Sequence, residues 1–172
     1  IPISDCDSFD SNAFDPKSLP KIPENVPGRY RSVADYHELY LSGLITPLAV
    51  VESLLPLIRR DVPNSRHSVA FIDSNVEEIL KEAKASTQRF KDGTSLGIMD
   101  GIPTAIKDET DVAGYRTRSG RKQNDQVFKI AEKSSWPVQT LRNAGSIIIG
   151  KLNMHELGAD TTNNNPNWGT PR

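Results

Sequence analysis

The segment Gly97-Ile-Met-Asp-Gly-Ile-Pro-Thr-Ala-Ile-Lys-Asp108 decides the fold of this 172-residue chain. Its glycines and proline lead into a short apolar run, Pro103 to Ile106, bounded by turn-forming residues, which is typical of a buried strand. Lys107 and Asp108 follow at the end of that run. An amine at the edge of an apolar interior can be desolvated, which favours its neutral form, and a neutral lysine is a usable general base. An ordinary surface ion pair closing a strand is the alternative.

Two helices are predicted well before this segment. Ser32 and Asp35 have the spacing of a capping box, so a helix is expected to begin at Ser32 and to end at Gly43. Thr46 is a suitable N-cap for a second helix, and Pro56 is expected to kink that helix or to end it early.

The rest of the chain alternates between strand and helix patterns. A strand is predicted over Val69 to Asp73, then a helix from Asn75 to about Phe90 with an i,i+4 ion pair between Glu77 and Lys81. A further helix is predicted over Ser134 to Asn143 and a short buried strand over Ser146 to Gly150. This alternation predicts an α/β fold in which helices cover a mixed β-sheet.

Composition limits the partners and the organisation. Residues 1–31 hold five of the twelve prolines and little periodicity, so they are expected to form an extended arm before an α/β domain over 32–172. The net charge of −1 gives no indication of nucleic acid or an anionic membrane as a partner, and no apolar run is long enough to span a membrane. A single cysteine, Cys6, and the absence of an Asn-x-Ser/Thr sequon favour the cytoplasm, with a processed secreted form as the alternative.

Three further patterns were considered as sites. Arg116 to Lys122 carries four positive residues in seven positions, which we interpret as a solvated loop rather than a collar for an anion. His155-Glu156 begins like a zinc-binding helix, but Ala159 stands where the second histidine is required, so no metal is predicted. Gly145 to Lys151 has the spacing of a phosphate-binding loop, but three consecutive isoleucines occupy the flexible part, so this interpretation is rejected.

Three blocks of the chain, in order, resemble the amidase signature family. They are Gly101-Ile-Pro-Thr-Ala-Ile-Lys-Asp108 with Asp111-Val-Ala-Gly114, Leu141 to Met154, and Trp168-Gly-Thr-Pro-Arg172. The resemblance implies that Lys107 is the catalytic lysine and that it works with a bridging serine in a cis peptide and a nucleophilic serine. Both serines belong to a Gly/Ser-rich segment expected beyond Arg172, so the chain is expected to be the N-terminal part of that fold. Asp108, Asp111 and Asn153 are expected to hold the loops around the lysine by capping nearby backbone groups.

The resemblance implies hydrolysis of a small-molecule amide through an acyl-enzyme, without a cofactor. A chain with the lysine but neither serine is expected to be inactive alone. It is also expected to self-associate, or to pair with the C-terminal part, because its strands lack neighbours. The alternative is that the chain works by itself as a non-catalytic binding or signalling module.

Overall fold

A computed structural model of the protein describes residues 30–62 and 67–170. The arm predicted over residues 1–31 falls almost entirely outside the described residues. No helix in the described part of the chain is both long enough and apolar enough to cross a lipid bilayer.

The predicted N-caps begin the first three helices. Helix α1 (Val33–Leu41) has a complete capping box, in which Asp35 N donates to Ser32 Oγ at 3.2 Å and Ser32 N donates to Asp35 Oδ2 at 2.6 Å. Thr46 caps α2 (Pro47–Ile58), and Asn75 caps α3 (Val76–Lys91). Local capping chemistry therefore fixes where these helices start.

Helix α2 does not end early, because it continues through Pro56 to Ile58. Pro56 lacks the N–H that would bond to the preceding turn. This loss occurs only two residues before the helix ends, and the neighbouring Leu55 and Ile58 are buried. Burial of this apolar face maintains the last turn despite the missing hydrogen bond.

Two other local expectations are wrong in detail. Ser68–Ala70 forms a short 3₁₀ turn, so strand β1 covers only Phe71–Asp73. Lys81 pairs with Glu78 at 3.2 Å, three residues away, instead of Glu77. Both i,i+3 and i,i+4 neighbours share a helix face, so spacing alone does not select between these two carboxylates.

The three strands form one mixed sheet, as the sequence predicts. Strand β3 (Ile147–Leu152) lies between β1 and β2 (Pro103–Lys107), in the order β1-β3-β2. It runs parallel to β2 and antiparallel to β1. The central strand is thus the last of the three in the sequence.

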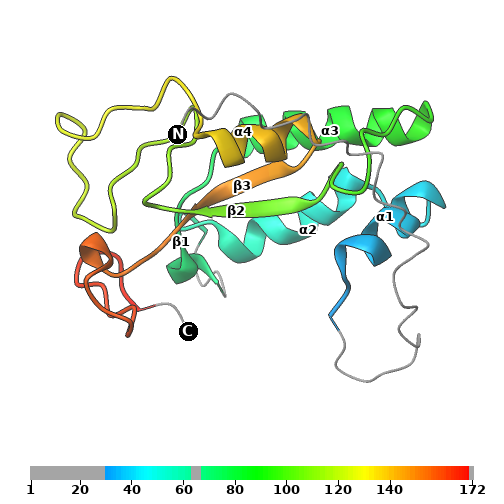
Figure 1. Ribbon diagram of the computed structural model, residues 1–172. Helices are drawn as coiled ribbons and strands as arrows, with labels where there is room; N and C mark the ends of the chain where they lie inside the picture. Colours follow the sequence, from blue (N-terminus) through cyan, green and yellow to red (C-terminus); the bar gives the residue numbers. More distant parts are fainter. Residues whose placement is uncertain (1–29, 63–66, 171–172) are drawn as a thin grey trace.

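Helices cover both faces of the sheet (Figure 1). Ile147 and Ile149 of β3 pack with buried residues of α2 and α3, whereas Ile148, between them, packs with Val138 of α4 (Trp136–Asn143). Successive side chains of a strand point to opposite faces, so three consecutive isoleucines supply both halves of the core. The same isoleucines that exclude a phosphate-binding loop are the centre of the sheet.

The carboxyl ends of β2 and β3 lie on the same side of the molecule. The loop of residues 108–135 and the segment 153–170 both gather at that side (Figure 1). Side chains placed at these strand ends are held by the rigid sheet while the loops surround them.

Candidate active site

Lys107 is the last residue of β2 and lies in register with Leu152 of β3. Its side chain is 52% exposed, and its Nζ lies 3.0 Å from Oε1 of Glu109, whose side chain is 50% exposed. The desolvation expected at the strand end is therefore absent in this part of the protein. The strand places the amine at the sheet edge but does not enclose it.

Asp108, the next residue, is completely buried. Its backbone N–H donates to Leu152 O at 3.1 Å, and its carboxylate Oδ2 accepts hydrogen bonds from the backbone N–H groups of Arg118 at 3.2 Å and Gly120 at 3.0 Å. Its backbone carbonyl accepts a third, from Ser119 N at 3.1 Å. Asp108 thus fastens the loop at 118–120 to the end of the sheet.

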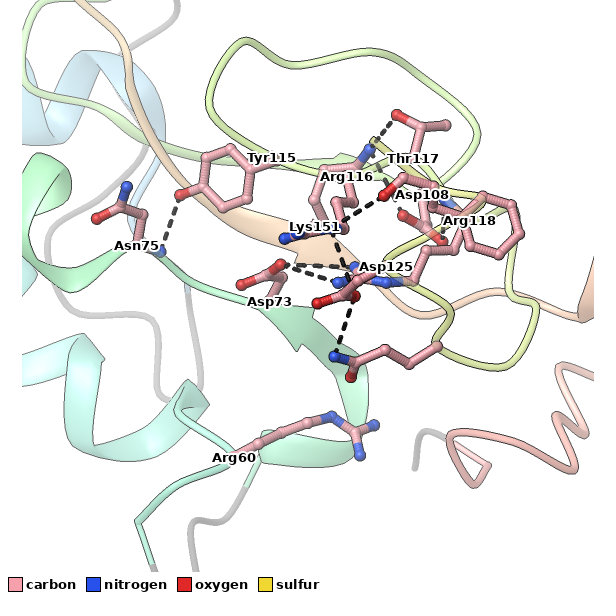
Figure 2. A network of polar contacts seen from close by, with 12 residues as sticks. Arg60, Asp73, Asn75, Asp108, Tyr115, Arg116, Thr117, Arg118, Asp125 and Lys151 are labelled. Atoms are coloured by element: carbon pink, nitrogen blue, oxygen red, sulfur yellow. Dashed lines mark hydrogen bonds and ion pairs between the residues drawn. The ribbon is translucent and has the colours of Figure 1, made fainter. Parts of the chain in front are cut away.

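Lys151 is a second lysine at this edge and is completely buried (Figure 2). Its Nζ donates to Thr110 O at 2.7 Å and to Thr117 Oγ1 at 3.0 Å, and it lies 3.5 Å from Asp108 Oδ1. We missed this residue because we considered it only as part of the rejected phosphate loop. The signal was nonetheless present, since a charge within an apolar strand requires a buried partner.

Burial affects both members of this pair. Desolvation lowers the pKa of Lys151, and the Asp108 carboxylate partly opposes that shift. Desolvation likewise raises the pKa of Asp108, opposed by the hydrogen bond from Gly120 N and by the charge of Lys151. The ammonium has three oxygen neighbours and the carboxylate accepts two amide N–H groups, an arrangement that fits the ionised form of the pair.

The basic segment Arg116 to Lys122 is not a solvated loop. Arg118 is only 3% exposed, and its guanidinium pairs with Asp73 at 3.4 Å and lies 5.7 Å from the centre of the Trp168 ring. Arg116 donates from Nε to Phe128 O at 2.9 Å and pairs with Asp125 at 3.4 Å (Figure 2). These arginines hold the loop against the sheet, which charge counting along the sequence does not reveal.

Asn153 follows β3 and connects three segments. Its Nδ2 donates to Val69 O at 3.0 Å and to Gly169 O at 2.8 Å, and its Oδ1 accepts from Met154 N at 2.8 Å. The side chain is nearly buried, with all of these partners belonging to the backbone. In this geometry Asn153 fixes the path of the chain near the strand ends.

Asp111 lies farther along the same loop and is exposed. Its backbone carbonyl accepts a hydrogen bond from Ser135 N at 3.0 Å. No hydrogen bond to its carboxylate is formed by any residue within 30–62 or 67–170. Its charge acts on the buried Lys151, whose protonated form it favours.

The described residues provide the amine but no complete catalytic group around it. Within them, no three His, Cys, Asp or Glu side chains gather where they could hold a metal ion. The Lys107 amine is accessible, while Lys151 is enclosed by its three oxygen neighbours. Of these two lysines, only Lys107 can reach a group that lies outside the chain described here.

Comparison with known proteins places this geometry in a family. The family model for "Amidase" matches residues 57–172. Fatty acid amide hydrolase of Arabidopsis thaliana is 40% identical over 147 residues, covering 84% of this chain and 24% of that protein. A mitochondrial glutamyl-tRNA(Gln) amidotransferase of Homo sapiens is 32% identical over 134 residues, covering 77% of this chain and 24% of the matched polypeptide.

A solved amidase structure has a similar fold. It matches with a TM-score of 0.69 and 29% identity, covering 83% of this chain and 31% of that protein. The chain therefore spans about a quarter of the length of the curated relatives it matches. With a family match over most of its length and 40% identity to one member, the chain belongs to the amidase family.

Proposed function

We propose that this chain is the N-terminal part of an enzyme that hydrolyses amide bonds, with Lys107 as the group that transfers the proton. The observation that carries the proposal is the position of Lys107 within the matched region, as an accessible amine at the carboxyl end of a sheet strand. The bridging and nucleophilic serines implied by the family resemblance are proposed to lie in the remainder of the protein. Asp108, Asp111 and Asn153 are proposed to support the loops around the amine.

The chemistry requires a group of this kind. An amide is a poor electrophile, so its cleavage needs an activated nucleophile, a proton for the leaving amine and donors for the oxyanion. A neutral lysine that takes the serine proton and returns it to the leaving group supplies the first two. The ion pair with Glu109 must open for this step, and an exposed pair of this type contributes only about 0–1 kcal/mol.

The chain alone is proposed to be inactive, because the serines and the oxyanion donors are not among its described groups. Membership of the amidase family favours this hydrolase over a binding or signalling module. A cytoplasmic location stays a prediction from cysteine content, and one of the relatives is a mitochondrial protein.

The test is the turnover of Lys107→Ala and Lys107→Arg in the protein that contains this chain. A long-chain fatty acid amide is the first substrate, because one relative is named for that class, and a simple aryl amide is the second. Loss of a positioned general base costs ~10²–10⁴ in rate, and we expect the upper end because the same amine acts as base and then as acid. Arg is expected to be almost as damaging, since a guanidinium does not release its proton.

Glu109→Gln is the matched control, because it removes the ion pair and keeps the amine. We expect this variant to retain turnover. If Lys107→Arg retained most of its turnover, Lys107 would be an ordinary charge at a strand end and the proposal would be wrong.

A further inference from the structure

We propose that Lys151 is the positioning residue of Lys107: its buried ammonium holds the turn that follows the catalytic amine. This inference rests on the proposed function. It concerns a residue on the neighbouring strand that does not itself reach the substrate.

The first connection runs through the turn of residues 107–110. Thr110 N donates to Lys107 O at 3.1 Å and closes the turn. The carbonyl of Thr110 then accepts the shortest hydrogen bond of Lys151, at 2.7 Å. Lys107 is therefore fixed on one side by strand pairing and on the other by a turn that the ammonium holds.

The second connection runs through Asp108, whose backbone directly continues that of Lys107. The Asp108 carboxylate orders the amides of Arg118 and Gly120, and Lys151 also donates to the hydroxyl of Thr117 in the same loop. One ammonium thus joins the turn after the catalytic lysine to the loop that surrounds it (Figure 2). A displacement of about 1 Å at a catalytic group can cost about 100-fold in rate, so this restraint matters for turnover.

The pair also explains why the position requires a cation. Asp108 Oδ1 is buried and accepts no hydrogen bond from any described residue, and its partner is the Lys151 ammonium at 3.5 Å. Removing Lys151 alone leaves a buried carboxylate without a compensating charge, which destabilises the fold. A change at both residues separates the contribution to folding from the contribution to position.

The experiment compares Lys151→Met, the double variant Lys151→Met/Asp108→Asn, and Thr117→Val in the complete protein. The double variant replaces the ion pair by neutral groups of similar size, and Thr117→Val removes one acceptor without removing a charge. Lys81→Met is the matched control, since Lys81 is an exposed lysine paired only with Glu78. Each variant is assayed well below its melting temperature, so that kcat is measured on folded protein.

We expect the double variant to recover most of the melting temperature that Lys151→Met loses, while its kcat remains 10- to 100-fold low and its KM changes less than threefold. Thr117→Val should lower kcat by two- to tenfold, and Lys81→Met should change nothing. A purely structural role predicts that kcat recovers together with the melting temperature.

Lys107→Ala, measured in parallel, keeps the two proposals apart. If it is inactive while the folded double variant and Thr117→Val have wild-type kcat, the role of Lys151 is refuted and that of Lys107 stands. If Lys107→Ala turns over normally, the proposed function fails and the positioning role fails with it.

Discussion

Replacement of Asp100 should show how strongly one buried carboxylate joins α3 to the sheet. Its side chain is completely buried in the turn before β2. Oδ1 accepts from Ser86 Oγ at 2.7 Å and Arg89 Nη2 at 2.5 Å, while Oδ2 accepts from Arg89 Nε at 2.9 Å and Leu96 N at 3.0 Å. All four donors lose their partner in Asp100→Ala.

Removing one partner of a buried ion pair costs about 3–5 kcal/mol. We take about 4 kcal/mol for Asp100→Ala, because Arg89 is partly exposed and can regain water while the Ser86 hydroxyl cannot. This is a large share of a typical stability of about 5–15 kcal/mol. It corresponds to a fall in melting temperature of about 8–16 °C for a protein of this size.

The effect should also depend on pH. Burial by itself raises the pKa of Asp100, but hydrogen bonds from Arg89, Leu96 N and Ser86 outweigh it and hold the pKa below its usual value. A carboxyl group with a depressed pKa stabilises the fold above about pH 4, and that contribution is lost as pH falls through the folded-state pKa. The difference between wild type and Asp100→Asn should therefore shrink between pH 7 and pH 3.

Urea unfolding followed by circular dichroism measures both quantities. Asp92→Asn is the control, because Asp92 is an exposed carboxylate near the end of the same helix, and its substitution should change stability by less than about 0.5 kcal/mol. The reasoning is refuted if Asp100→Ala costs no more than about 1 kcal/mol, or if the difference for Asp100→Asn is the same at both pH values.

Two further predictions concern packing and association. Gly101→Ala should destabilise the fold by about 1–3 kcal/mol more than Gly43→Ala in the same unfolding assay, because both have positive φ but only at Gly101 would the new Cβ lie 2.6 Å from Pro47 Cγ. The 172-residue chain alone should associate through the edges of its sheet, where β2 has β3 as its single strand neighbour within the described residues. Light scattering that gave a 19.0 kDa monomer over a wide concentration range would contradict the second expectation.

Local chemistry explains which parts of the fold were predictable from the sequence. Ser32, Thr46 and Asn75 act on backbone groups three residues away, so their role as N-caps is written in adjacent sequence. The run Pro103 to Ile106 and the isoleucines before Gly150 were likewise recognisable as strands, since periodicity and turn residues lie within a short window. Pro56 misled because a local cost was outweighed by burial of the apolar face of α2.

The charged centre of the site depends instead on distant partners. Arg118 pairs with Asp73, 45 residues earlier, and Lys151 donates to Thr110, 41 residues earlier. Nothing in the immediate sequence distinguishes the buried Arg118 from the more accessible Arg121, so the whole segment looked solvated. The lysine implied by the family resemblance, Lys107, was identified by its motif, whereas its buried neighbour required the fold to be known.

The central position of β3 has a consequence for the order in which the protein can fold during synthesis. Neither β1 nor β2 bonds to the other, so both lack a partner strand until residues 147–152 have left the ribosome. Helices α2 and α3 share a core cluster and lie within the first 91 residues, so they can pack earlier and shield part of that apolar surface. Sheet formation then waits on contacts that span more than 40 residues on one side and about 80 on the other, which is a slow topology. A nascent chain of this protein carries two unpaired strands through most of its translation, and these are the segments a chaperone has to protect.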